Sequence, residues 1–194
     1  LRICKEIFDE DEFRAWPHVG VVLQAYLRET EQDVHDLLAW AKNRGTPISV
    51  RLVRGAYWDY ETVIAQQRHW PIPVFTRKWE TDVNFERLVT LLLEHTHLLR
   101  PAFATHNIRS IAYALATVRA FGLPERTIEF QMLYGMGDAI KSTLVQLGQR
   151  VRVYAPFGEL LPGMGYLVRR LLENTSNDSF LRQSFVEHAA VNDM

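Results

Sequence analysis

The apolar positions of this chain alternate between two spacings. Short apolar runs of strand length are separated by segments in which apolar residues recur every three to four positions, as on an amphipathic helix. The spacing predicts strands over 19–26, 48–53, 101–107, 127–134 and 150–155. Residues 2–14 are predicted to hold the end of a helix, followed by an acidic turn at 9–12. Further helices are predicted over 31–44, 58–67, 83–97, 108–121, 138–147 and 162–174.

Five strand–helix units in succession imply parallel strands joined by right-handed crossovers. The chain therefore belongs to the α/β class. Two architectures fit, a doubly wound sheet and part of a (βα)8 barrel. In both, ligands bind at the carboxyl ends of the strands.

The stretch 48–58 is the one around which the rest is organised. Its apolar and mostly β-branched residues Ile48, Val50, Leu52 and Val53 predict a strand buried on both faces, yet Arg51 and Arg54 interrupt it. An unpaired charge in an apolar site is costly. Two arginines at a strand end, followed by small residues, point to an anionic or electron-rich ligand. The alternative is that both arginines pair with carboxylates on neighbouring loops.

The other predicted strands end in polar or small residues too, apart from Leu133. These strand ends hold Gln24, Gly55, Thr105, His106, Asn107, Gln131, Leu133 and Tyr154. We expect them to converge with the two arginines on one rim. An alternative for His106 is that it is a core histidine whose ring nitrogens are hydrogen-bonded within the protein. Asp82 is expected to cap the helix over 83–97.

Two further motifs lie towards the carboxyl terminus. Gly135-Met-Gly137 lacks the third glycine of a dinucleotide fingerprint, so a tight strand-to-helix turn is the better interpretation. Arg169 and Arg170 are adjacent, and a guanidinium matches a carboxylate in bidentate geometry. Glu173 is four residues after Arg169 and could pair with it instead.

Composition narrows the function classes. The net charge of −1 over 194 residues gives no nucleic-acid signal. The single cysteine, Cys4, excludes a disulfide framework, and His95 and His97 lack the register for a metal site. No apolar run reaches the length of a membrane span. Since the chain starts with Leu1, we expect an excerpt of a longer cytoplasmic protein.

Six ordered motifs between about Gly20 and Phe180 resemble one family, the proline dehydrogenase domain of the bifunctional proline utilization A flavoenzymes. The motifs are RLVRGAYWD at 51–59, FTRK at 75–78, FATHN at 103–107, YGMG at 134–137, VYAP at 153–156 and YLVRRLLEN at 166–174.

The resemblance implies a distorted (βα)8 barrel that holds FAD, of which residues 1–180 cover roughly strands 4 to 8 and residues 181–194 form a tail or the start of a linker. It implies oxidation of L-proline to Δ1-pyrroline-5-carboxylate by hydride transfer to flavin N5. The implied partners are a membrane quinone as electron acceptor, approached by peripheral membrane association, and an aldehyde dehydrogenase domain in the same polypeptide.

The resemblance also implies residue roles. Arg51 resembles the arginine beside flavin N5, and Tyr57, Tyr154 and Leu133 resemble the walls around the substrate ring. Arg169 and Arg170 resemble the pair that holds the substrate carboxylate. The implied cofactor contacts are Gln24, Arg51, Arg54, Gly55, Ala56, Trp58, Thr76, Lys78, Thr105, His106, Asn107, Gln131, Leu133, Glu173 and Phe180. Arg54 departs from the pattern, because many members have lysine there.

The family's site also uses a lysine and an aspartate from earlier strands, which this sequence does not include. We therefore expect the sheet of this chain to have exposed strand edges. Two other functions stay open. One is a non-catalytic binding or regulatory remnant of the barrel, and the other is a barrel enzyme that clamps a phosphate with its arginines.

Overall fold

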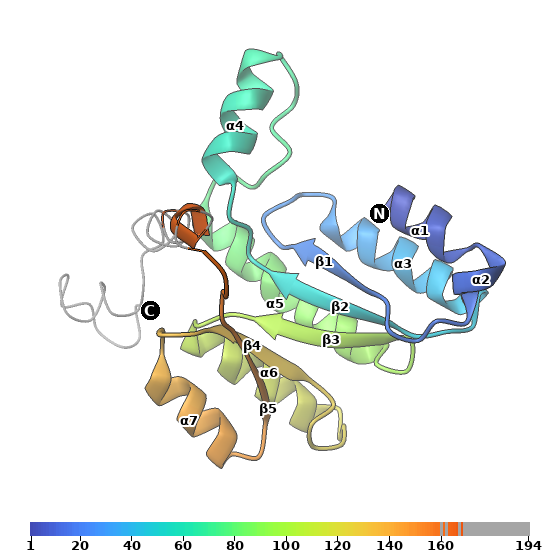
Figure 1. Cartoon of the computed structure of the whole chain (residues 1–194), viewed down its shortest axis with the longest axis vertical. Coiled ribbons are helices and arrows are strands. Elements are labelled where there is room, and N and C mark those ends of the chain that lie inside the picture. The colour runs from blue at the N-terminus through green and yellow to red at the C-terminus, as the bar shows by residue number, and fades with distance from the viewer. Residues whose placement is uncertain (160, 162, 167, 169–194) are drawn as a thin grey trace.

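In the computed structural model, which describes residues 1–159, 161, 163–166 and 168, five parallel strands form one sheet. The strands are β1 (Gly20–Gln24), β2 (Ile48–Val53), β3 (Leu99–Ala104), β4 (Glu129–Leu133) and β5 (Arg150–Tyr154). The helices are α1 (Arg2–Phe8), α2 (Asp11–Arg14), α3 (Thr30–Arg44), α4 (Trp58–Gln67), α5 (Lys78–Glu94), α6 (Ile108–Ala120) and α7 (Asp138–Gln146). The α/β class and the parallel sheet are confirmed (Figure 1).

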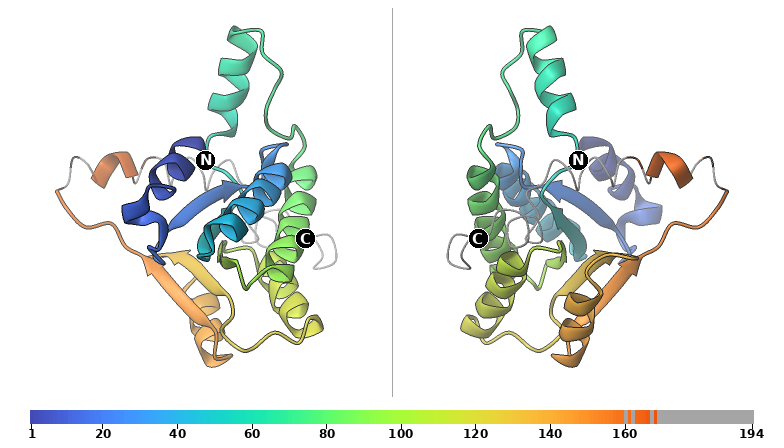
Figure 2. Two further views of the ribbon diagram at one scale, coloured as in Figure 1. Left: turned by 90° about the vertical axis from the view of Figure 1, so that its right-hand side faces the viewer. Right: turned by 90° about the vertical axis from the view of Figure 1, so that its left-hand side faces the viewer.

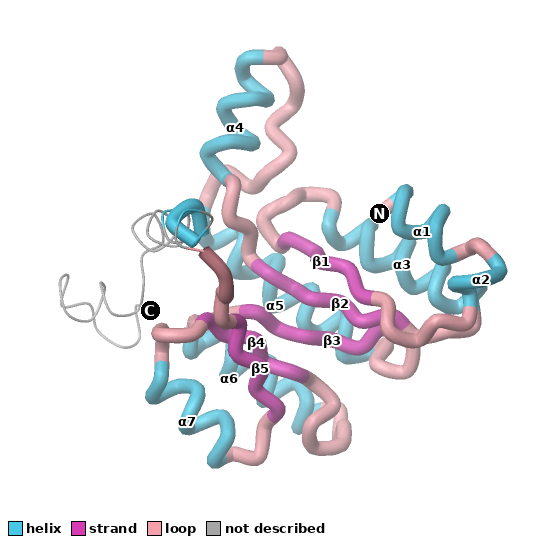
Figure 3. Tube along the Cα trace, viewed as in Figure 1, coloured by secondary structure: helices cyan, strands magenta, loops and turns pink. Residues whose placement is uncertain are grey.

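The order of the strands separates the two architectures that the sequence left open. Neighbours in the sheet are consecutive in the chain, in the order β1-β2-β3-β4-β5, with every pair parallel. A doubly wound sheet reverses its strand order at a switch point. No reversal occurs among the described strands, so the arrangement is that of consecutive units of a singly wound sheet (Figure 3). Within the described residues β1 and β5 are its open edges.

The two faces of the sheet have different surroundings. Helices α3, α5 and α6 lie along one face (Figure 2), where Ile48, Val50 and Leu52 are fully buried. Side chains alternate along a strand, so Ser49, Arg51 and Val53 point to the opposite side, which we call the inner face. They are half-buried. The prediction that this strand is buried on both faces is therefore wrong for the described residues.

The start of α5 also differs from the prediction. The helix begins at Lys78, where the Glu80 carboxylate accepts a hydrogen bond from the Arg77 backbone N–H at 3.0 Å. Asp82 therefore lies within α5 and does not cap it. Its carboxylate pairs with Arg54 instead, at 2.7 Å. Sequence spacing could not distinguish a helix cap from an ion-pair partner at Asp82, because the partner, Arg54, comes close only in the folded chain.

Between β2 and α5 the chain makes an excursion that carries α4 away from the body of the molecule (Figure 1). The two ends of the excursion are joined where the Trp58 indole Nε1 donates to the Phe75 carbonyl at 2.7 Å. An isolated antiparallel bridge between Leu27 and Val74 ties the returning segment to the end of β1. The base of the excursion is thereby held at the carboxyl edge of the sheet.

Candidate functional site at the carboxyl edge of the sheet

All five strands are parallel, so their carboxyl ends meet along one edge of the sheet. The register places Gln24 beside Val53 and Leu133 beside Tyr154. Thr105, His106 and Asn107 follow directly after β3. The structure therefore brings the predicted rim residues of the described chain to one side of the molecule, as the strand–helix alternation implied.

A relay of hydrogen bonds crosses the inner face below that edge. The Arg51 Nε donates to Gln131 Oε1 at 2.7 Å, and Gln131 Nε2 donates to Glu129 Oε1 at 2.8 Å. Arg152 then donates to both oxygens of Glu129, at 2.7 and 2.9 Å. Arg51 and Gln131 were predicted site residues, and the structure joins them across 80 positions of sequence.

Glu129 and Arg152 were missed by the sequence reasoning. Glu129 is buried, and the hydrogen bond from Arg152 holds the pKa of its carboxyl below the ordinary value, against the opposing effect of burial. A usable signal did exist. Glu129 with Gln131, and Arg150 with Arg152, keep the two-residue period of a strand face, so opposite charges on neighbouring strands were readable as a pair.

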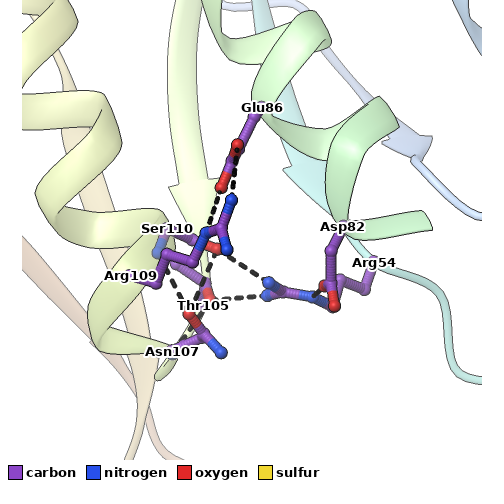
Figure 4. A network of polar contacts seen from close by, with 7 residues as sticks. All are labelled: Arg54, Asp82, Glu86, Thr105, Asn107, Arg109 and Ser110. Carbon is purple, nitrogen blue, oxygen red and sulfur yellow. Dashed lines mark hydrogen bonds and ion pairs between the residues drawn. The ribbon is translucent and has the colours of Figure 1, made fainter. Parts of the chain in front are cut away.

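Arg54 lies beyond β2 in a separate network (Figure 4). Its Nε donates to Asp82 at 2.7 Å, its Nη1 to Thr105 at 3.0 Å and its Nη2 to Ser110 at 2.7 Å. The guanidinium also stacks 4.9 Å from the centre of the Phe85 ring. Arg54 thus forms a structural ion pair, as the alternative proposed, but its carboxylate partner lies in helix α5 rather than on a loop, and its other two partners are hydroxyls after β3 and in α6.

Replacing Arg54 by methionine is expected to lower the free energy of unfolding by about 2–3 kcal/mol, because a half-buried carboxylate loses its cationic partner and two buried hydroxyls each lose one hydrogen bond. Urea denaturation followed by tryptophan fluorescence measures it. The matched control is Arg109→Met, which breaks the ion pair between Arg109 and Glu86 (Figure 4). The Arg109 side chain is 66% exposed. That pair should contribute less than about 1 kcal/mol. Equal losses in the two variants would contradict the anchoring role of Arg54.

The strand-end residues after β3 have partners within the chain as well. Asn107 Oδ1 accepts from the Ser110 backbone N–H at 3.0 Å and caps α6. His106 Nε2 accepts from the Leu133 backbone N–H at 3.1 Å, which links the ends of β3 and β4. Burial, followed by the charge of Lys141, lowers the pKa of His106, so its neutral form is favoured.

Packing against Tyr26 explains why position 55 is occupied by glycine. Its φ is +128°, and a Cβ built there would lie 2.5 Å from ring atoms of Tyr26, a buried residue just after β1. A side chain at this position meets both an unfavourable backbone conformation and an aromatic ring. The close approach at Gly55 in this structure is therefore to Tyr26.

The remaining predicted residues present more open surfaces. Ala56, Tyr57 and Trp58 are exposed at the start of the α4 excursion, and Thr76 and Lys78 are exposed at its end. Tyr154 is 54% exposed and its ring centre lies 5.6 Å from that of Tyr166. The predicted residues Arg169, Arg170, Glu173 and Phe180, and the predicted tail 181–194, lie outside the described residues.

Guanidinium donors, amide groups and exposed aromatic side chains thus border one edge of the sheet. This combination can hold a flat, electron-rich ring together with an anion. Within the described part of the chain, none of the helices has the length and apolar character needed to span a membrane.

Comparison with known proteins identifies the group of proteins to which this arrangement belongs. The family model described as "Proline dehydrogenase" matches residues 1–183. The "Bifunctional protein PutA" of Klebsiella aerogenes is 36% identical over 192 residues, which are 94% of this chain and 14% of that protein. "Proline dehydrogenase 2" of Bacillus subtilis is 35% identical over 179 residues, covering 91% of this chain and 52% of that protein.

The structural comparison agrees with the sequence comparison. A crystal structure of proline utilization A from Bdellovibrio bacteriovorus, inactivated by N-propargylglycine, superposes with a TM-score of 0.94 at 50% identity. The match covers 99% of this chain and 20% of that chain. This chain therefore spans a minor part of the bifunctional relatives and about half of the Bacillus subtilis relative.

Proposed function

Because this chain belongs to the proline dehydrogenase family, of the type found in proline utilization A, we propose that it forms part of an enzyme that oxidises L-proline to Δ1-pyrroline-5-carboxylate with FAD as cofactor. The observation that carries the proposal is the relay on the inner face, in which Arg51, Gln131, Glu129 and Arg152 are joined across β2, β4 and β5.

The relay fits a cofactor better than it fits simple packing. The interior of a (βα)8 barrel is ordinarily filled with bulky branched side chains. Here the inner face holds two arginines, an amide and a carboxylate on β2, β4 and β5, with Arg51 in the carboxyl half of β2 and Glu129 at the start of β4. The guanidinium donors suit a flat ring that gains negative charge when it is reduced, and the carboxylate and the amide hold them in place, so the residues present fit a flavin. FAD, when bound, supplies the two-electron acceptor.

The residues of this chain would hold and tune that cofactor. Arg51, oriented by Gln131, would place a cation against the part of the ring where negative charge accumulates, which lowers the barrier to reduction. Gln24 ends β1 and Leu133 ends β4 at the same carboxyl edge, and both would contact the ring. Thr76 and Lys78, exposed at the start of α5, would contact the dinucleotide portion.

The substrate would be oriented by its carboxylate. Arg169 and Arg170 suit that task because a guanidinium binds a carboxylate in bidentate geometry. Tyr57 and Tyr154, which are 48% and 54% exposed at the same edge, would form walls around the pyrrolidine ring. Holding the ring carbon towards the acceptor supplies the orientation that hydride transfer requires.

The architecture is proposed to be a closed (βα)8 barrel in which β1 to β5 are the last five strands. Consecutive strand order, helices on one face and open edges at β1 and β5 support closure by further strands. Those strands would add the family's lysine and aspartate. By analogy with the bifunctional relatives, an aldehyde dehydrogenase domain in the same polypeptide and a membrane quinone are the proposed partners.

The test is to purify the full-length protein and add L-proline. A yellow preparation whose flavin absorbance bleaches under anaerobic conditions supports the proposal, and N-propargylglycine, which inactivated the Bdellovibrio relative, should abolish the bleaching irreversibly. Flavin that does not bleach would favour a non-catalytic remnant. A colourless protein that hydrolyses phosphate esters would favour the phosphate-clamping alternative.

Arg170→Met tests the carboxylate clamp. We expect the KM for proline to rise about 100-fold, because a charge-assisted bidentate contact is lost, while FAD content stays at the wild-type level. Steady-state kinetics measures the KM. The ratio of flavin absorbance at about 450 nm to protein absorbance at about 280 nm measures the FAD content. Parallel loss of FAD and of proline affinity would refute this role.

A further inference from the structure

Glu129 is a buried carboxylate with two different partners on the inner face. The residue is 9% exposed. Its Oε1 accepts from both Arg152 Nε and Gln131 Nε2, at 2.7 and 2.8 Å, while its Oε2 accepts from Arg152 Nη2 at 2.9 Å. Arg152 thus fixes the carboxylate plane, and the carboxylate in turn holds the amide of Gln131, two residues further along β4.

The contact with Glu129 determines which end of the Gln131 amide faces Arg51. An amide has one oxygen acceptor and one nitrogen donor group. Because an ionised carboxylate accepts only, it selects the Nε2 end, and Oε1 is left to accept from Arg51 Nε at 2.7 Å. Turning the amide over would set N–H groups against the guanidinium N–H and an oxygen against the carboxylate. Both hydrogen bonds would be lost.

We propose that Glu129 is a positioning residue, which orients the Arg51 guanidinium through the amide of Gln131 and so sets the rate of proline oxidation. The proposal rests on the proposed function. Preorganised charge at a reacting centre is effective only when it is held in place, and small displacements lower the rate steeply. Glu129 touches neither substrate nor cofactor in this scheme.

The first test is Glu129→Gln in the full-length holoenzyme. The substitution keeps the size of the side chain but offers Gln131 either an acceptor or a donor, so the amide orientation is no longer fixed. We expect kcat per bound flavin to fall about tenfold, with KM within about twofold of wild type and FAD content unchanged.

The matched control is Glu86→Gln. Glu86 forms an ion pair of the same kind with Arg109, at 2.8 and 3.3 Å, but between helices α5 and α6 on the other side of the sheet. Both glutamates have mostly buried side chains, and both arginines are mostly exposed. Glu86→Gln should leave kcat unchanged. An equal fall in both variants would show a general structural effect and overturn the proposal.

The decisive test removes the relay. In a Gln131→Met background there is no amide to orient, so adding Glu129→Gln should change neither kcat nor the visible absorption spectrum of the bound flavin. In the wild-type background it should change both. Equal effects in the two backgrounds would overturn the proposal. Wild-type enzyme that fails to oxidise proline would instead refute the proposed function, which keeps the two failures apart.

Glu129→Asp serves if Glu129→Gln does not fold. It retains the charge that pairs with Arg152 but withdraws the carboxylate from Gln131 by one methylene group. We expect kcat to fall with FAD retained and the flavin spectrum altered. Wild-type kcat together with a wild-type spectrum would overturn the proposal.

Discussion

Replacing Arg51 by methionine is expected to lower the rate of flavin reduction by proline about 10²–10³-fold, the range found when a preorganised electrostatic contact is removed from an active site. Arg51 projects from the carboxyl half of β2 onto the inner face, and its Nε is fixed by Gln131 at 2.7 Å. The rate is measured by anaerobic stopped-flow absorbance and expressed per bound flavin, which separates a slower reaction from loss of cofactor.

The chain offers a matched control for Arg51. Arg100 pairs in register with Ser49 and therefore points to the same inner face, but from the amino half of β3. Arg100→Met removes the same charge from the same face and should change the rate less than about twofold, because active sites of such folds lie at the carboxyl ends of strands. Equal effects would show that net charge alone matters. Arg51→Lys should recover part of the rate, since it keeps the charge but loses the planar fork.

Replacing Gly55 by alanine is expected to destabilise the end of β2 by about 3 kcal/mol, from a strained backbone together with overpacking. The added Cβ would lie 2.5–2.6 Å from three atoms of the Tyr26 ring, which is buried and cannot simply swing into solvent. Native-state hydrogen exchange of peptides covering 19–26 and 48–55 measures the local free energy of opening.

Gly45→Ala is the control for Gly55→Ala. Gly45 also has a positive φ, +73°, where it ends α3, but nothing lies within 4 Å of its added Cβ. Its cost should be about 1 kcal/mol, from the backbone alone. The difference between the two variants reports the Tyr26 contact, so equal losses would contradict the packing explanation for Gly55.

Much of the fold followed from local patterns. Most strand and helix positions between residues 19 and 154 were predicted, because two-residue and 3.6-residue periods record which face of each element is buried. The helix predicted over 2–14 is divided into α1 and α2, and most of the helix predicted over 162–174 lies outside the described residues. Convergence of Gln24, Thr105 and Tyr154 on one edge followed from parallel strands alone. The error at Asp82 arose because a capping preference is a local rule, and Arg54, 28 residues earlier, takes this carboxylate instead.

The sequence by itself determined the α/β class, the parallel direction of the strands and the family, because these depend on periodicity and on ordered motifs such as RLVRGAYWD at 51–59. Only the tertiary structure decided what each charge does. It gave the two arginines of one strand different partners, placing Arg54 among α5, β3 and α6, and Arg51 beside Gln131. It also revealed Glu129 and Arg152. The physical reason is that hydrogen bonds and ion pairs act over a few ångströms, and strand register, rather than separation along the chain, sets which side chains come that close.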